Sequence, residues 1–189
     1  MDLPGPRPGE GVWPAWLYER LLEQRLVLVQ GRLDRELATR LCAQLLTLDA
    51  TGDAPVRLHL ASPDGELAAA LTVIDVFDLL TVPVHAVATG QVGGPSVGVL
   101  AAAHDRRAYP HATFRLSEPR GRFEGSAAEL ATQNEQHRWL LDDFYARLAQ
   151  DIRRPVARVR HDTRQGRFLT AGQAVTYGLI DAIVEQRTG

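Results

Sequence analysis

One stretch of the sequence carries the residue types of a hydrolase nucleophile. Gly94-Pro95-Ser96-Val97-Gly98 matches the pattern G-x-S-x-G, in which a sharp strand-to-helix turn presents a serine hydroxyl. The apolar run 84–88 before it predicts a buried strand, and the small and aliphatic residues 96–103 after it predict a closely packed helix. The alternative is a serine in the first helical turn that satisfies backbone donors, and we favour it because five small, common residues often match by chance.

The histidines do not single out a general base. His85 lies at the start of a predicted strand, His104 ends the predicted helix at 96–103, His111 lies in a turn and His161 lies near Gly166. For His104 we expect a favourable interaction with the helix carbonyl dipole. No His or Cys spacing is typical of a metal site, and the single cysteine, Cys42, lies in an apolar helical pattern that predicts an inert core thiol. We therefore expect no metal and no cofactor.

Composition narrows the class of protein. The chain has 189 residues, a formal charge of −2 and 45% hydrophobic residues, which is typical of one domain with a real core. All 21 basic residues are arginine and they are scattered, so neither nucleic acid nor a membrane surface is an expected partner. Residues 1–14 contain four prolines and no apolar run, and no later run has membrane-spanning length. The expected location is the cytoplasm.

Apolar periodicity predicts an α/β domain over residues 15–189, after a mobile Pro/Gly-rich tail at 1–14. Alternating strands and helices at this spacing predict a parallel sheet covered by helices. Asp34 is the predicted cap of the second helix. The predicted helices are 16–22, 35–48, 66–80 and 96–103, and the predicted strands are 26–29, 56–60 and 84–88.

The pattern changes after the glycine-rich turn. Ser126 and Glu129 form a capping box that predicts a helix over about 126–152. This helix is long for the domain and only its second half is amphipathic, so we expect it to project and to pack on another copy. The remaining predictions are extended segments at 106–109 and 113–116, a helix opened by Pro155, a helix capped by Thr170 and Gln173 and ended by Gly178, and a strand at 179–183.

From about Trp16 to Glu185 the chain resembles the proteolytic subunit of the Clp protease, the ClpP family. The resemblance implies a crotonase-like α/β subunit in seven-membered rings, stacked in pairs through the long "handle" helix. It also implies a Ser-His-Asp triad inside a chamber and an AAA+ unfoldase docking outside. The matching motifs are YERLLEQRLVLVQGRLD, ASPDGELAAALTVID, GQVGGPSVGVLAAA, PHATFRLSEP and DTRQGRFLTAGQAVTYGLIDAIV.

The family's catalytic residues are replaced at every matching position. Aligning the motifs places the nucleophile on Gly94, the histidine on Ser117 and the aspartate on Gly166. Glycine has no side chain, and serine cannot take up and return a proton near pH 7 as imidazole does. Asp162 and Glu118 flank these positions and are expected to shape the chamber.

The resemblance also implies an oxyanion hole and an unfoldase-docking surface, and both are altered. Pro95 stands where the family has one backbone N–H donor, and proline has none. The other donor survives as Gly65, but its neighbour is Asp64, an acid that would repel a developing oxyanion. The family's docking tyrosines fall on Arg57 and His59, so we expect weakened docking.

These observations predict a non-catalytic subunit of a Clp protease ring that assembles with a catalytic paralogue, with itself, or with both. Two alternatives remain open. The chain is an active serine peptidase or hydrolase that uses Ser96, or it is a homo-oligomeric crotonase-like binding protein that keeps Gly65 as a carbonyl-binding donor.

Overall fold

Five parallel strands form the main sheet, in the order β1-β2-β3-β5-β8. Every neighbouring pair in it is parallel. The computed structural model describes residues 14–121 and 123–185, so the predicted tail, apart from Pro14, lies outside the described residues. The strands confirm the predicted α/β class. Their bounds are β1 Leu26–Gln30, β2 Val56–Ala61, β3 Val84–Ala88, β5 Asp105–Ala108 and β8 Ala182–Ile183.

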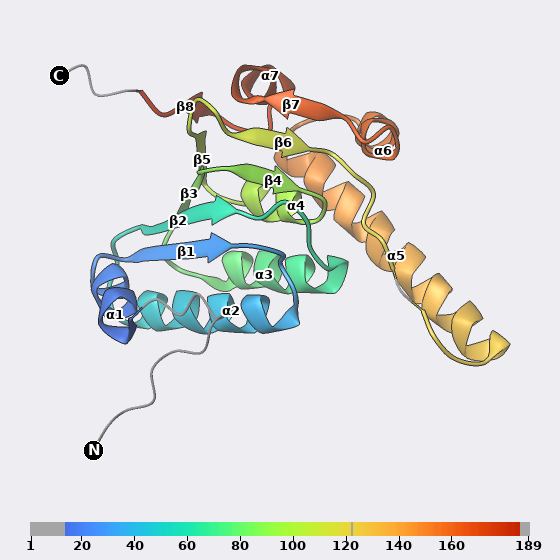
Figure 1. Ribbon diagram of the computed structural model, residues 1–189, viewed down its shortest axis with the longest axis horizontal. Coiled ribbons are helices and arrows are strands. Elements are labelled where there is room, and N and C mark those ends of the chain that lie inside the picture. The colour runs from blue at the N-terminus through green and yellow to red at the C-terminus, as the bar shows by residue number, and fades with distance from the viewer. Residues whose placement is uncertain (1–13, 122, 186–189) are drawn as a thin grey trace.

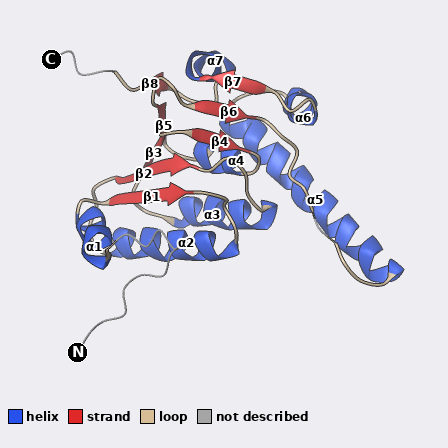
Figure 2. Cartoon of the chain, viewed as in Figure 1, coloured by secondary structure: helices blue, strands red, loops and turns tan. Residues whose placement is uncertain are grey.

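Helices α2 (Arg35–Ala50) and α3 (Leu67–Leu79) lie side by side against one face of this sheet, as Figures 1 and 2 show. The Asp34 carboxylate accepts a hydrogen bond from the Leu37 N–H at 2.9 Å, which confirms the predicted cap. The apolar stripe of α2 is buried in the core, and so is Cys42. Burial raises the pKa of the Cys42 thiol, which fits the prediction of an inert core residue. Helix α1 spans Ala15–Glu23.

A second, three-stranded sheet was only partly predicted. Strand β6 (Thr113–Arg115) matches a predicted extended segment, but β4 (Gln91–Gly93) and β7 (Phe168–Thr170) were not expected as strands. Strand β6 lies between the other two, parallel to β4 and antiparallel to β7. Each strand has three residues, too few for a periodic pattern, so their pairing is what defines them.

The last strand is shorter than predicted. Helix α7 (Ala171–Tyr177) has the predicted capping box, and Gly178 ends it with φ +81°. The N–H groups of Leu179 and Ile180 then donate to the Ala174 carbonyl. Because these two N–H groups close the end of α7, they do not extend β8. The prediction of a strand over 179–183 was therefore wrong except at Ala182–Ile183.

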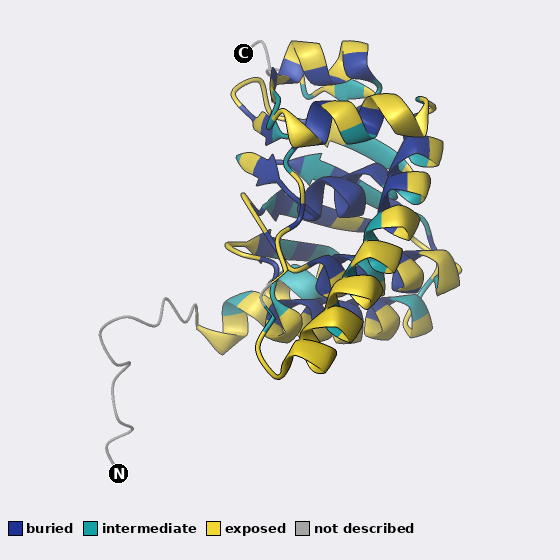
Figure 3. Cartoon of the chain, turned by 90° about the vertical axis from the view of Figure 1, so that its right-hand side faces the viewer, coloured by how far each residue is buried: buried dark blue, intermediate teal, exposed yellow. Residues whose placement is uncertain are grey.

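Helix α5 (Ala127–Asp151) projects from the body of the protein (Figure 1). Both hydrogen bonds of the Ser126–Glu129 capping box are present, so the predicted long helix is confirmed. Its 25 residues span about 37 Å at 1.5 Å per residue. All of its fully buried residues lie in the second half, and its first half is mostly exposed, as Figure 3 shows.

The short helix α4 (Ser96–Ala101) is buried along its whole length. A Cβ built on Gly98 would overlap the ring of Phe144 on α5, which confirms the predicted close packing. Helix α6 (Val156–Arg164) packs on α5 as well. Within residues 14–121 and 123–185, no helix is both long and apolar enough to cross a membrane.

Candidate functional site

The elbow between β4 and α4 is held from two sides. The Gly93 N–H donates to the Ser62 carbonyl at 2.9 Å, and the Gly94 N–H donates to the Arg115 carbonyl on β6 at 3.1 Å. Gly94 adopts φ +55°, in the left-handed region that favours glycine. A side chain on Gly93 would overlap the Pro63 carbonyl. The elbow is therefore held between the turn at 62–65 and β6 by these contacts.

The carboxylate of Asp64 fills the space in front of Gly94. One of its oxygens, Oδ1, accepts the Gly65 N–H at 2.8 Å. The other, Oδ2, accepts a hydrogen bond from Arg32 at 3.1 Å. A Cβ built on Gly94 would lie only 2.7 Å from Asp64 Oδ1. The N–H that the resemblance assigns to the oxyanion hole is thus already bonded to an anion of the same chain.

Ser96 is fully buried at the first position of α4. The Ser62 hydroxyl donates to the Asp64 carbonyl at 3.0 Å, and because a hydroxyl has one proton, the 2.8 Å contact between Ser62 and Ser96 has Ser96 as its donor. The expectation that Ser96 satisfies backbone donors is wrong, since the first N–H groups of α4 donate to backbone carbonyls and the Ser96 hydroxyl bonds to Ser62. Ser96 instead ties the start of α4 to the turn at 62–65.

A cleft of about 670 Å³ lies next to the elbow, and two of the three positions matched to the catalytic triad line it. Ser117 and Gly166 line it together with Asp64. A Cβ on Gly94 would lie 3.7 Å from Ser117 Oγ. Gly166 has φ +64° and open space beside it. Ser117 and Gly166, which lie far apart along the chain, therefore face one cavity.

One histidine lines this cleft, and it is one that the sequence did not single out. His137 lies on α5, and its ring packs edge-to-face on Phe123 with centroids 5.4 Å apart. Among the residues that the structure describes, no hydrogen bond joins His137 to a hydroxyl or a carboxylate, as a general base would require. The other histidines do not line the cleft. His104 accepts the Val84 N–H at 3.2 Å through Nδ1.

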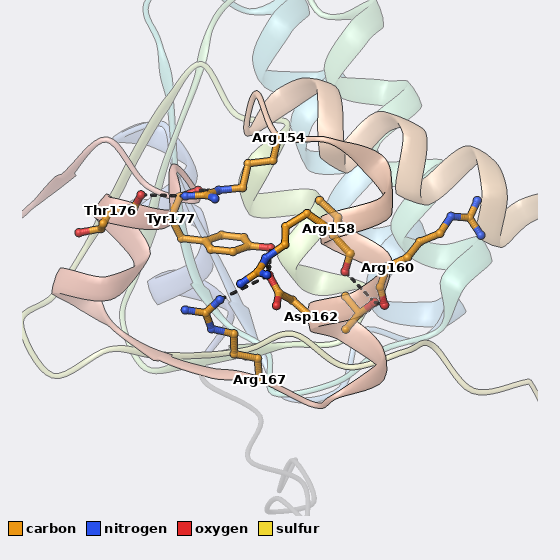
Figure 4. Close-up of polar contacts among 9 residues, drawn as sticks. Arg154, Arg158, Arg160, Asp162, Arg167, Thr176 and Tyr177 are labelled. Atoms are coloured by element: carbon orange, nitrogen blue, oxygen red, sulfur yellow. Dashed lines mark hydrogen bonds and ion pairs between the residues drawn. The ribbon is translucent and has the colours of Figure 1, made fainter.

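Asp162 is held in a polar cluster behind the cleft (Figure 4). Its Oδ2 accepts hydrogen bonds from Arg158 at 3.0 Å and from the Tyr177 hydroxyl at 3.0 Å, and Arg167 lies 3.4 Å away. Burial, together with the bond to Asp162, raises the pKa of Tyr177 to about 12. Arg154 stacks on the same tyrosine ring at 4.3 Å. These contacts tie α6 to α7, so Asp162 braces the wall of the cleft and does not enter it.

Glu118, the other predicted flanking residue, does line the cleft. It lies 3.5 Å from Arg164 and accepts a hydrogen bond from the Tyr145 hydroxyl at 3.4 Å. Burial raises the pKa of Tyr145. Over the described ranges, no group of three His, Cys, Asp or Glu side chains is arranged to hold a metal ion.

Arg57 and His59 lie on one face of β2, on the side away from the buried Leu58 and Leu60. Arg57 is exposed and donates to the Gln24 carbonyl at 3.1 Å. His59 is half-buried, its ring 6.3 Å from that of Tyr109, and burial lowers its pKa, with the Arg57 charge acting in the same direction. Any partner at this face meets a fixed positive charge.

Comparisons with known proteins agree with this arrangement. The family model described as Clp protease matches residues 13–187. The chain is 32% identical to ATP-dependent Clp protease proteolytic subunit 1 of Mycobacterium tuberculosis and 33% identical to that of Mycobacterium leprae. It is 31% identical to proteolytic subunit 2 of Mycolicibacterium paratuberculosis. Each match covers 89% of this chain and 86% of the relative. With a parallel sheet, a projecting α5 and a cleft where the matched segments meet, the chain belongs to the Clp protease family.

Proposed function

We propose that this chain is a non-catalytic subunit of a Clp protease ring, with a structural or regulatory role in ATP-dependent protein degradation. The observation that carries the proposal is the position of Asp64. Its carboxylate accepts the Gly65 N–H and occupies the space in front of Gly94 where a nucleophile would begin. Next to Gly94, a peptide carbonyl in the cleft would therefore have no nucleophile to attack it and no free N–H to bond its oxygen.

The other triad positions support the same function. Ser117 offers a hydroxyl where a base is needed, and Gly166 offers no carboxylate to orient one. Pro95 supplies no N–H next to Gly94, and loss of one oxyanion donor alone typically lowers the rate of an acyl-transfer enzyme by about 10²–10³. Ser96 is fully buried and already donates to Ser62. Its use as a nucleophile would require α4 to separate from the turn at 62–65.

We assign the chain to a seven-membered ring of the cytoplasm, formed with a catalytic paralogue or with further copies of itself. Its relatives are named as proteolytic subunits 1 and 2 of ATP-dependent Clp proteases. We assign the stacking of two rings to the exposed first half of α5. This half carries Trp139, with 62% of its surface exposed. Docking of an AAA+ unfoldase is weakened at Arg57 and His59, because a charged residue disfavours an apolar anchor.

Labelling with a fluorophosphonate, a serine-reactive probe, tests the proposal. The full chain is labelled alone and after co-expression with an active ClpP, and labelled serines are identified by peptide mass spectrometry. We expect the chain to co-purify in the ring and the label to appear only on the active partner's serine. Label on Ser96 that disappears in Ser96→Ala would overturn the non-catalytic assignment. A chain that never enters a ring containing active subunits, and forms none of its own, would overturn the assembly.

A further inference from the structure

The cleft beside Gly94 has an excess of positive charge. Four arginines line it against two carboxylates, although the whole chain carries a formal charge of −2. The arginines come from β6, from the connection after it, from α5 and from α6. They are Arg115, Arg120, Arg138 and Arg164. The local charge is therefore built by residues from four segments and does not follow from the composition.

The two carboxylates of the cleft are already engaged. Asp64 is bonded to Arg32 and to the Gly65 N–H, and Glu118 lies against Arg164 and the Tyr145 hydroxyl. Within the described part of the chain, no carboxylate pairs with the other three arginines of the cleft, which are Arg115, Arg120 and Arg138. These guanidinium groups remain available to a ligand.

Arg115 is the most enclosed of these three arginines. Its Nε atom is buried and, among the described residues, meets no hydrogen-bond acceptor. Its guanidinium lies over the ring of Phe168, 5.6 Å from the centroid. Because that Nε has no solvent-accessible surface, a ligand in the cleft meets the terminal Nη groups, which donate to no acceptor among the described residues. A planar guanidinium is suited to a bidentate carboxylate.

The size and remaining lining of the cleft fit a peptide segment. A volume of about 670 Å³ lies in the range of small-ligand sites, about 300–1,000 Å³. Ser117, Thr163 and Asn134 add neutral hydrogen-bonding groups, and Leu141 adds an apolar contact. Asn134, Arg138 and Leu141 recur at spacings of four and three, so α5 presents one face to the cleft.

We infer that the cleft binds carboxylate-bearing peptides without cutting them, with Arg115 as the anchor and Arg120 and Arg138 at the mouth. The carboxylate is the C-terminus of a peptide or the side chain of an acidic residue. The inference names the ligand of the same cleft and rests on the proposed function, in which peptides reach this cleft inside a Clp protease ring. The subunit then retains or selects acidic segments and products where its active relatives would cleave.

Titration calorimetry on the full chain tests this inference with four acetylated probes. The C-terminal source is tested by penta-alanine with a free carboxylate against its amide. The side-chain source is tested by Ala-Ala-Glu-Ala-Ala amide against its Gln counterpart. We expect at least one carboxylate peptide to bind roughly 10- to 100-fold more tightly than its neutral partner, the range of a charge-assisted hydrogen bond. Equal affinity within both pairs, or no binding by any probe, would overturn the inference.

Variants locate the site. Arg115→Met keeps an apolar stem against Phe168, and we expect it to remove most of the carboxylate preference while the melting temperature without ligand stays equal or rises. Arg138→Gln, at an exposed position of α5, is the second variant and should weaken the preference in part. Arg40→Met removes the same charge from the exposed face of α2 and should change nothing. A preference that survives in both cleft variants would overturn the assignment.

Mass spectrometry of the peptides after each titration separates the two proposals. Intact peptides with no carboxylate preference would refute this inference alone. Cleaved peptides would refute the non-catalytic function, whatever the affinities.

Discussion

Ser96 donates a buried hydrogen bond of 2.8 Å to Ser62, which in turn donates to the carbonyl of Asp64 at 3.0 Å. This chain of two bonds connects the start of α4 to the turn that carries Asp64 and Gly65. The serine of the G-x-S-x-G match therefore supports the turn at 62–65. Its Oγ would lie 3.3 Å from a Cβ built on Gly65. A pattern typical of a nucleophile here belongs to a residue that shapes the backbone around the cleft.

Unfolding of Ser96→Ala and Ser62→Ala in urea measures the two bonds separately. Ser96→Ala removes one donor and should lower the free energy of unfolding by about 0.5–1.5 kcal/mol. Ser62→Ala leaves both the Ser96 hydroxyl and the Asp64 carbonyl without this partner, so it should cost more, about 1–3 kcal/mol. A larger loss for Ser96→Ala than for Ser62→Ala would contradict the direction of donation.

A double-mutant cycle between Gly94→Ser and Asp64→Ala measures how far Asp64 excludes a side chain from the nucleophile position. Gly94→Ser places a Cβ 2.7 Å from Asp64 Oδ1 and forces a non-glycine residue to φ +55°. We expect it to lower the free energy of unfolding by about 1–2 kcal/mol, the usual cost of a left-handed residue together with a displaced surface contact.

In the Asp64→Ala background only the backbone cost should remain, so the two losses should add to more than the loss in the double variant. Strict additivity in urea unfolding would show that Asp64 does not compete for this space. Neither variant is expected to gain peptidase activity, because Ser117 and Gly166 still supply no base and no orienting acid.

Gly98→Ala tests the close contact between α4 and the long helix. The added methyl group overlaps the ring of Phe144, which is buried among the core residues. Overpacking of this kind typically costs about 1–3 kcal/mol, more than alanine gains over glycine in helix propensity. Gly172→Ala on α7 is the matched control, since a Cβ there meets nothing within 4 Å and should stabilise. Equal stabilisation by both substitutions would contradict the packing.

Local signals were sufficient to predict most of the fold. The caps at Asp34, Ser126 and Thr170 each depend on residues within three positions along the chain, and all three form as expected. The strands of the main sheet follow from apolar runs. Strands β4 and β7 were missed because three residues show no period. Their partners on β6 lie about 22 and about 55 residues away along the chain, respectively.

The residue types at the site could be predicted from the sequence, but the orientation of their side chains could not. Two of the matched residues, Ser117 and Gly166, line the cleft, but the orientation of a side chain depends on partners that are distant along the chain. Asp64 was expected to repel an oxyanion, yet its carboxylate takes the Gly65 N–H itself. His137 was missed because it lies in the polar half of a long helix, with no motif around it to mark it.

Asp181 should make stability depend on pH at the edge of the main sheet. Its carboxylate accepts the Arg106 backbone N–H at 2.9 Å and pairs with the Arg106 guanidinium, and the bond from that side chain holds the pKa of Asp181 below its usual range. The unfolded chain therefore binds this proton more readily, so the stabilisation is complete above the unfolded pKa of about 3.9 and is lost as the pH falls through the lower folded value. Asp181→Asn should be less stable than the unmodified chain at pH 7, and the difference in urea unfolding should shrink below about pH 4. Asp53→Asn, at an exposed position, is the control, and its free energy of unfolding should stay close to that of the unmodified chain. If Asp181→Asn lost the same free energy of unfolding at every pH in this range, its charge would not be what stabilises the sheet edge.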